Sequence, residues 1–391
     1  MMKYFASRMD HVPKSFIREI LKVTENPEII SFAGGLPNPN LFPIKEIQEA
    51  AVKVLESDGK NVLQYSTTEG YYPLREYISK RYYEKHSLKI DPEEILITNG
   101  SQQALDLLGK IFINHSDQIL IEKPGYLGAI QCFSLYQPQF RSVSLKEDGI
   151  CLDELETVLK KDKIKFFYGV PNFQNPSGIT YSLSNRKELA KLLTRYSVNF
   201  IEDNPYGDLR FIGNDIPPVR SFMEEGGILL GSFSKTVVPS FRIGWVCAQK
   251  EIMNKLVIAK QGADLHTNYF SQRVVMQYLT DYNIENHINK IKESYKKQRE
   301  KMVEAIEAYF PKGISYTRPE GGMFLWVELP SFISSMKLFE KAVAENVVFV
   351  PGSPFYLEGG DNALRLNFSN SSEAVIDEGM RRLSKALKSF F

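Results

Sequence analysis

The chain has 391 residues and a formal net charge of +1, with 48 lysine and arginine residues against 47 aspartate and glutamate residues. Its length exceeds the roughly 250–300 residues at which one hydrophobic core stops growing, so we expect two domains. The balanced charge offers no basic face for nucleic acid or an anionic membrane. A hydrophobic content of 43% excludes a disordered or fibrous chain.

Neither a targeting segment nor a metal site is predicted. The first residues, MMKYFASRMDHVPKSF, lack the apolar region of roughly 7–15 residues that a secretory signal needs. Nowhere does the chain reach the ~18 apolar residues of a membrane span. The three cysteines, Cys132, Cys151 and Cys247, are odd in number and far apart, which argues against a disulfide framework. No histidine or cysteine spacing matches metal ligands. We therefore expect a cytoplasmic protein without a metal.

Short apolar runs alternate with helix-period stretches over most of the chain. One such stretch, with Ala104, Leu105 and Leu108 on one side, follows the first run. This alternation predicts an α/β fold with a mostly parallel, seven-stranded central sheet and helices on both faces. The predicted strands cover residues 95–98, 118–121, 140–143, 166–169, 199–202, 228–231 and 243–248.

The pattern changes near residue 271. From there to about residue 309 an apolar side opposes many lysines and glutamates, which predicts one long helix ended by Pro311 and Gly313. The remainder predicts a smaller α+β domain with strands over 323–328, 347–350 and 363–368. The predicted units are an N-terminal arm over 1–44, which contributes to the small domain, a large domain over 45–290 and a small domain over 291–391.

Polar and aromatic residues gather after five of the predicted strands. Open parallel sheets bind their ligands at the carboxyl ends of the strands, so five such clusters predict a single site. In chain order the clusters are Asn99-Gly100-Ser101, Tyr126, the segment PNFQNPSG over 171–178, Asp203, and Ser232 to Lys235.

Two of these turns suit a phosphate group. Gly100 lets the backbone turn tightly before a predicted helix, whose first N–H groups carry the positive end of the helix dipole. Taken alone, Ser101 also fits a plain helix cap. The second turn, Ser232 to Ser234, is followed by Lys235 and, seven residues later, by Arg242. A lone lysine is normally a solvated surface charge, but these neighbours favour a role in a ligand site.

Lys235 and Asp203 together predict chemistry on a heterocyclic ring. A lysine in a desolvated, cation-rich pocket is the usual nucleophile toward a carbonyl group. Asp203 alone fits a turn cap, but beside such a lysine it can keep a ring nitrogen protonated, which makes the ring an electron sink. Asn175 and Tyr206 offer donors for a phenolic oxygen on that ring, and Tyr126 offers a face for stacking.

These residues resemble a known family. GSFSKTVVPSFRIGW is similar to the lysine motif of the fold-type I, pyridoxal-phosphate-dependent aminotransferases of class I/II. FQNPSG is similar to their Asn-Pro-x-Gly turn, and EDNPYGDLRF to their Asp-x-x-Tyr segment. The likeness covers nearly the whole chain. SFAGGLPNPNLFP, LQYSTTEGYYPLR and YTRPEGGMFLWVELP are closer still to the 2-aminoadipate (LysN-type) and kynurenine aminotransferase branch.

The resemblance implies a role for each candidate residue. Lys235 would carry the cofactor covalently, Asp203 would pair with its pyridine nitrogen, and Tyr126 would stack on its ring. Asn175 and Tyr206 would contact the ring O3′. The phosphate would be held by Ser101, Gln102, Ser232, Ser234 and Arg242. Tyr65 would act in catalysis by reaching the phosphate in the neighbouring subunit's site, which implies a homodimer with shared active sites.

Arg365 is the candidate for the substrate carboxylate. In the segment over 363–368 the apolar side chains alternate onto one face, which leaves Arg365 on the other. A guanidinium fork matches a carboxylate with two parallel hydrogen bonds, although an ordinary strand arginine at a solvent face is an equal alternative. The resemblance implies that Arg365 binds the α-carboxylate, with Asn175 and Gly35 beside the same substrate.

The arm over 1–44 would also contribute to the substrate site. In the 2-aminoadipate branch a serine and an arginine meet the distal carboxylate of the substrate, and Ser15 and Arg18 match both places. The alternative is a surface Arg18 balanced by Glu19 or Glu25, which contributes little. Both interpretations stay open.

The function implied is transamination by a ping-pong mechanism. An amino acid (2-aminoadipate, glutamate, leucine, or an aromatic or kynurenine-type one) would pass its α-amino group to 2-oxoglutarate or another 2-oxo acid. One alternative is a C–S β-lyase, which shares the lysine and the aspartate. Another is the effector-sensing domain of a transcription regulator. Such regulators carry an N-terminal DNA-binding domain, for which an arm that begins within the first fifteen or so residues leaves no room.

Overall fold

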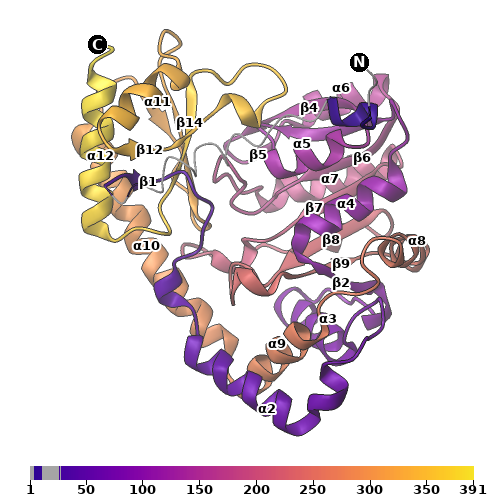
Figure 1. Cartoon of the computed structure of the whole chain (residues 1–391). Coiled ribbons are helices and arrows are strands. Elements are labelled where there is room, and N and C mark those ends of the chain that lie inside the picture. The colour runs from indigo at the N-terminus through magenta and orange to yellow at the C-terminus, as the bar shows by residue number, and fades with distance from the viewer. Residues whose placement is uncertain (1–3, 11–25, 27) are drawn as a thin grey trace.

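The computed structural model describes residues 4–10, 26 and 28–391. Its main sheet has eight strands in the order β2-β9-β8-β7-β6-β3-β4-β5 (Figure 1). The strands are β2 (Ile95–Asn99), β3 (Gln118–Lys123), β4 (Gln139–Lys146), β5 (Gly149–Ile150), β6 (Ile164–Gly169), β7 (Asn199–Asp203), β8 (Gly227–Ser232) and β9 (Ile243–Cys247). All seven predicted strands are present. The eighth, β5, is a two-residue edge strand that is too short to leave a sequence pattern.

The main sheet is mostly parallel, as the sequence predicts. Strands β4, β3, β6, β7 and β8 pair in parallel in that order. Strand β9 runs antiparallel to both β8 and β2, so β2 points the same way as β8. The edge strand β5 is antiparallel to β4.

Helices cover both faces of the main sheet, since successive side chains of a strand point to opposite faces. On β3, Ile119 and Ile121 join one core cluster, whereas Leu120 joins another on the opposite face. The first face packs against α4 (Gly100–Phe112), α5 (Leu127–Ser134) and α8 (Lys250–Gln261). The opposite face packs against α6 (Leu152–Lys161), α7 (Leu183–Arg195), α2 (Ile44–Val62), α3 (Tyr72–His86) and α9 (Tyr269–Asp281).

A smaller α+β unit contains a four-stranded antiparallel sheet (Figure 1). Its strands are β10 (Ser315–Tyr316), β11 (Phe324–Glu328), β14 (Ala363–Asn367) and β13 (Val350–Pro351). The helices beside it are α10 (Ile284–Tyr309), α11 (Ser335–Ala344) and α12 (Glu373–Lys388). A separate parallel pair joins β1 (Ile30–Ser31) to β12 (Val347–Val348), so residues before α2 pair with the C-terminal part of the chain.

The single long helix expected over 271–309 is instead two helices. The helix breaks at Tyr282 and Asn283, whose backbone is extended, and the side-chain oxygen of Asn283 caps the second helix by accepting from the N–H of Glu285 at 2.9 Å. The long α10 runs from the base of the large unit to the small one (Figure 1). It contains residue 290, where the sequence predicts the boundary between large and small domains, so that division stays a prediction.

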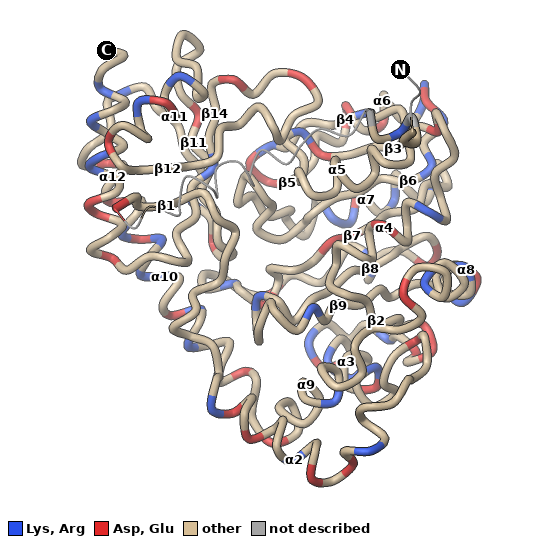
Figure 2. Tube along the Cα trace, viewed as in Figure 1, with Lys and Arg blue, Asp and Glu red and all other residues tan. Residues whose placement is uncertain are grey.

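Charged side chains of both signs are interspersed along the described trace (Figure 2). Within the described residues, no helix combines the length and the apolar character that crossing a membrane requires. No cluster of three or more histidine, cysteine, aspartate or glutamate side chains able to hold a metal ion occurs in the same part of the chain.

Candidate active site

A cavity opens at one edge of the main sheet. The carboxyl ends of β2, β3, β6, β7 and β8 share that edge, because these strands point the same way. Strand β9 points the opposite way, which brings the residue just before it, Arg242, to the same edge. The lining consists of Gly35, Ser101, Gln102, Leu105, Tyr126, Val170, Asn175, Asp203, Pro205, Tyr206, Ser232, Ser234, Lys235, Pro239, Arg242 and Arg365.

Asp203, the last residue of β7, presents an unpaired oxygen in this site. Its side chain is buried, and the hydroxyl of Tyr168 on β6 donates to Oδ2 at 2.8 Å. The other oxygen, Oδ1, has no hydrogen-bond partner among the residues that the structure describes. Burial raises the pKa of Asp203 to about 6, although the Tyr168 bond opposes this shift. A cationic N–H group of a ligand would satisfy Oδ1 and keep the carboxylate ionised.

Lys235 lies in the turn that follows β8. Its Nζ donates to the carbonyl oxygen of Gly35 at 2.8 Å. Burial, and then the positive charges of Arg365 and Arg242, lower the pKa of Lys235 to about 8. A neutral amine is therefore accessible near neutral pH, as a nucleophile or a general base requires.

The backbone around the N-terminus of α4 forms a cradle for an anion. Gly100 has a φ of +71°, and a Cβ atom at this position would lie 2.5 Å from Nη2 of Arg242. Only glycine therefore allows the guanidinium to approach the first turn of the helix. Ser232 and Ser234 line the same part of the cavity from the turn after β8. Helix N–H groups, hydroxyls and a guanidinium together suit a phosphate group.

Arg365 reaches the cavity from β14 of the small unit. Its Nη1 donates to Oδ1 of Asn175 at 2.7 Å, and its Nη2 donates to the carbonyl oxygen of Ala33 at 2.5 Å. The side chain is buried, and no ion pair of the described residues includes it. Burial lowers its pKa to about 10, so it stays charged at neutral pH. A buried guanidinium without an acidic partner favours an anionic ligand.

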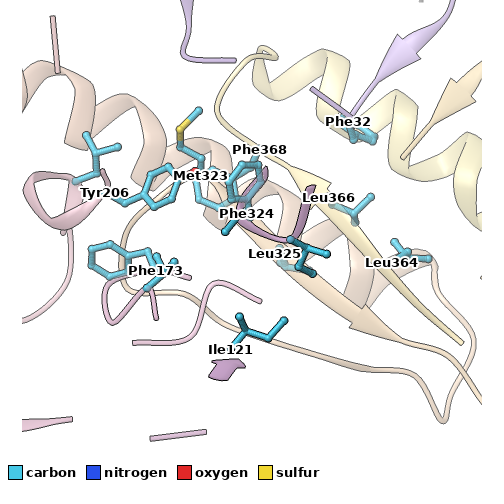
Figure 3. Packing of buried hydrophobic residues seen from close by; sticks show 14 of the residues in the cluster. Phe32, Ile121, Phe173, Tyr206, Met323, Phe324, Leu325, Leu364, Leu366 and Phe368 are labelled. Carbon is cyan, nitrogen blue, oxygen red and sulfur yellow. The ribbon is translucent and has the colours of Figure 1, made fainter. Parts of the chain in front are cut away.

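Two aromatic contacts link Arg365 to Tyr206. The guanidinium lies over the ring of Phe324, 4.3 Å from its centroid, and Phe324 meets Tyr206 edge-on at 5.8 Å. Figure 3 shows Phe324 with Tyr206 and Phe173 in this packed region. Burial raises the pKa of Tyr126 to about 12 and also raises that of Tyr206. Both phenols therefore stay protonated and can donate hydrogen bonds.

The cavity brings together most of the predicted site residues. Tyr65 is not among its lining residues. It is 80% exposed, and its ring meets that of His266 edge-on at 5.8 Å. Ser15 and Arg18 lie outside the described residues. The sequence interpretation missed Tyr168, because a tyrosine inside the apolar run FFYG carries no spacing signal for a contact with Asp203.

These features fit pyridoxal phosphate. The unpaired Oδ1 of Asp203 suits a protonated ring nitrogen, and the accessible amine of Lys235 suits an aldehyde carbon. The cradle between Gly100 and Arg242 suits the phosphate.

Comparison with known proteins agrees with this fit. Residues 29–383 match the family model described as "Aminotransferase class I and II". The chain is 43% identical to the aromatic-amino-acid aminotransferase 1 of Thermococcus litoralis, over 99% of this chain and 94% of that protein. It is also 43% identical to the 2-aminoadipate transaminase of Thermus thermophilus, over 98% of this chain and 96% of that protein.

A solved structure extends the likeness to the fold. LysN, the α-aminoadipate aminotransferase of Thermus thermophilus, complexed with N-(5'-phosphopyridoxyl)-L-leucine, superposes with a TM-score of 0.92 at 42% identity. The match covers 98% of this chain and 97% of that one. The family match and the relatives, over nearly the full length, show that the chain belongs to the class I and II aminotransferases and is a pyridoxal-phosphate-dependent enzyme of fold type I, similar to the 2-aminoadipate and kynurenine branch.

Proposed function

We propose that this aminotransferase moves the α-amino group of 2-aminoadipate, glutamate, leucine or an aromatic or kynurenine-type amino acid to 2-oxoglutarate or another 2-oxo acid. The names of the two relatives at 43% identity support an aromatic amino acid or 2-aminoadipate as donor, and the ligand of the solved structure supports leucine. The observation that carries the proposal is that Lys235, Asp203 and Arg365 line one cavity.

The proposed roles of Lys235 and Asp203 follow from their protonation. When bound, pyridoxal phosphate supplies an electron sink, since its protonated ring can accept the electron pair left when the substrate Cα loses a proton. Asp203 holds the proton on the ring nitrogen through Oδ1. The pKa of Lys235 is about 8, so a neutral Nζ is accessible near neutral pH. This Nζ takes the proton from Cα as a general base and later returns one as a general acid.

The remaining residues orient the two reactants. Arg365 donates from its fork to the α-carboxylate, and Asn175 steadies that fork through Oδ1. Tyr206 lines the same cavity as Asn175, so both can serve the ring-oxygen side while Asn175 also contacts Arg365. The phosphate is held by Ser101, Gln102, Ser232, Ser234 and Arg242. Because one cavity serves both half-reactions, the first oxo acid leaves before the second binds, as a ping-pong mechanism requires.

The direct test is product analysis with the purified holoenzyme. We expect leucine, 2-aminoadipate or an aromatic amino acid, incubated with 2-oxoglutarate, to yield glutamate and the matching 2-oxo acid in equal amounts. A C–S β-lyase would instead release pyruvate and ammonia from a β-thio amino acid without consuming 2-oxoglutarate. Absence of glutamate formation with all of these donors would contradict the proposal.

For acidic side chains we propose that Ser15 and Arg18 bind the distal carboxylate. Replacing Arg18 with alanine should lower kcat/KM for 2-aminoadipate and glutamate by about tenfold, because one charge-assisted contact is lost, while kcat/KM for leucine stays unchanged. Steady-state kinetics with the three donors measures this difference. If the ratio of kcat/KM for 2-aminoadipate to kcat/KM for leucine did not change, Arg18 would not bind the distal carboxylate.

We also propose that the enzyme is a cytoplasmic homodimer. Tyr65 would then serve the site of the other subunit. Its exposure on this chain and its absence from the lining of its own cavity support that role.

A further inference from the structure

A buried carboxylate, Glu122, lies on β3 behind the loop over 171–178 that carries Asn175. Its side chain is 1% exposed and is surrounded by donors. Oε1 accepts from the backbone N–H of Val170 at 2.9 Å and from the hydroxyl of Tyr181 at 2.5 Å. Oε2 accepts from Nε2 of Gln174 at 3.0 Å. Glu122 does not line the cavity.

The amide of Gln174 has only one orientation that satisfies its neighbours. Its Oε1 accepts from the backbone N–H of Ser177 at 2.8 Å and from the Ser177 hydroxyl at 2.7 Å. Its Nε2 donates to the carbonyl oxygen of Pro124 at 2.8 Å as well as to Glu122. A flipped amide would face donors with its NH2 group and a carbonyl with its oxygen. Glu122 must therefore present an acceptor to Gln174.

The surrounding donors favour the ionised form of Glu122. Each oxygen faces a donor, and a proton on Oε2 would oppose the NH2 group of Gln174. Burial, with the charge of Asp203 as a smaller contribution, raises the pKa of Glu122 to about 7, while the bonds from Tyr181, Val170 and Gln174 lower it. The three donors thus stabilise the negative charge of Glu122, whereas burial destabilises it.

The same contacts determine where Asn175 lies. Gln174 precedes Asn175, and the loop closes on Gln174 through its N–H to the carbonyl oxygen of Ile179 at 2.8 Å and through the N–H of Gly178 to its own carbonyl oxygen at 2.6 Å. Asn175 in turn accepts from Nη1 of Arg365 at 2.7 Å. A continuous path of hydrogen bonds and one peptide link runs from Glu122 to the guanidinium fork.

We propose that Glu122 is a positioning residue for recognition of the substrate α-carboxylate. Through Gln174 it fixes Asn175, and Asn175 holds the Arg365 fork in the orientation that matches a carboxylate. This inference rests on the proposed function of Arg365. Glu122 touches neither the substrate nor the cofactor. Its loss should weaken the affinity for ligands that carry a carboxylate. It should leave unchanged the reaction of ligands that offer the site only an amine.

The test compares a carboxylate ligand with an amine that lacks the carboxylate. In Glu122→Gln the new side-chain amide can point its NH2 group in two directions. In one it faces the NH2 group of Gln174, and in the other it faces the donors of Val170 and Tyr181. We expect the Kd of 4-methylpentanoate for the holoenzyme, measured by calorimetry, to rise by about tenfold. We expect kcat/KM for leucine to fall by a similar factor, while the single-turnover rate with 3-methylbutylamine changes by less than about twofold.

Tyr181→Phe is the matched control when affinities are compared at pH 9. It removes a donor from the same carboxylate, which raises the pKa of Glu122 further, but at that pH the carboxylate keeps its contact with Gln174. We expect it to lower the melting temperature, as Glu122→Gln does, while retaining the wild-type Kd for 4-methylpentanoate. Ser177→Ala removes one donor from Gln174 and supplies a milder test if Glu122→Gln does not fold. An increase in Kd is expected there too.

Three outcomes separate the hypotheses. Wild-type affinity for 4-methylpentanoate in both Glu122→Gln and Ser177→Ala would overturn the positioning role. Equal weakening by Tyr181→Phe and Glu122→Gln would also overturn it, since loss of stability would then explain the effect. The proposed function fails separately if Arg365→Ala binds 4-methylpentanoate as tightly as the wild type. With Arg365 already replaced, adding Glu122→Gln should cause no further weakening.

Discussion

At the scale of single residues, the site is organised by charges that the fold has partly removed from water. Lys235 and Asp203 titrate near pH 8 and pH 6, each shifted toward its neutral form chiefly by burial. Arg365 is shifted the same way but stays charged. In the proposed function, an anionic substrate would neutralise Arg365 and a cationic ring would neutralise Asp203, which supports these two places for the reactants.

The shifted pKa of Lys235 predicts a pH-dependent cost to the apoprotein. Below pH 8 the folded chain must hold a charged, desolvated amine that a methionine would avoid. Lys235→Met should therefore raise the free energy of unfolding at pH 7 by no more than about 3 kcal/mol. The gain should shrink between about pH 8 and 10.5, where the unfolded chain still binds a proton that the folded chain has released. Urea unfolding across this range measures it.

Lys296→Met is the control for that experiment, because Lys296 is exposed. It should change stability little at any pH in the range. A gain from Lys235→Met that stays constant from pH 7 to 10.5 would contradict the expected titration.

Tyr168 should affect the pH below which kcat falls. Its hydroxyl lowers the pKa of Asp203, so Tyr168→Phe should raise that pKa and move the acid limb of the pH profile of kcat to higher pH. Asp203→Asn cannot carry the negative charge and should lower kcat by about 10²-fold or more. Rate profiles between pH 5 and 9 test both. An acid limb unmoved by Tyr168→Phe would mean that Asp203 does not govern it.

The sequence singled out residues at or after strand ends and, through the family resemblance, Arg365 inside β14, but it missed Tyr168 and Glu122, which lie inside strands. Lys235, Asp203 and Asn175 stand out because polar residues after apolar runs have few structural reasons to be there. Tyr168 and Glu122 lie within strands, where a single polar residue looks the same whether it faces another buried group or solvent. Only the packing of β3, β6 and the loop over 171–178 shows what they touch.

At the scale of elements, the turn into α4 is the part of the cradle most sensitive to substitution. Gly100→Ala would force a Cβ against the Arg242 guanidinium and a side chain into a φ of +71°. We expect the Kd for pyridoxal phosphate to rise by at least about tenfold, with retained secondary structure. Titration of the apoprotein followed by absorbance measures the Kd. Gly59→Ala, where a Cβ would meet nothing within 4 Å, is the control and should bind normally.

The sequence predicted the strands of the main sheet that form apolar runs of several residues. It missed elements whose bounds depend on a few residues or on a single side chain. Six of the seven predicted strands of the main sheet are mostly buried, and all seven were found, including β4, in which only Val143 is buried. The pair of residues in β5 depends on its neighbour β4, and β1 depends on β12, which lies at the other end of the chain. The break between α9 and α10 rests on the single side chain of Asn283, inside a pattern that otherwise continues.

At the scale of the whole molecule, the cavity draws on both units and on the segment before α2. Asp203 and Lys235 belong to the large unit, Arg365 to β14, and Gly35 to the segment that follows β1. In the proposed function, the substrate carboxylate and the amine that acts on Cα would thus be held by different units. Sequence alone indicated the list of residues but not this division, because it depends on how the two sheets pack.

The proposed dimer predicts complementation between inactive subunits. Tyr65→Phe should weaken cofactor binding, and Lys235→Ala should abolish turnover. In a mixed dimer, one site would combine Lys235 from one subunit with Tyr65 from the other. Reassociating the two variants at equal concentration should therefore restore about a quarter of the wild-type activity. No increase over the Tyr65→Phe enzyme alone, with mixed dimers verified by mass spectrometry, would show that Tyr65 serves its own chain or no site.

The antiparallel β9 has a consequence for how the molecule is made. Strand β2 is the first of the main sheet to leave the ribosome, yet its only strand neighbour within the described part of the chain is β9, which is the last. A pairing so distant along the chain forms late, because closing a long loop costs entropy before any contact repays it. In the proposed site, the cradle for the phosphate of the vitamin-derived cofactor would be complete only once β9, which follows Arg242, has been inserted beside β2, so assembly of the catalytic centre would be among the final events of folding.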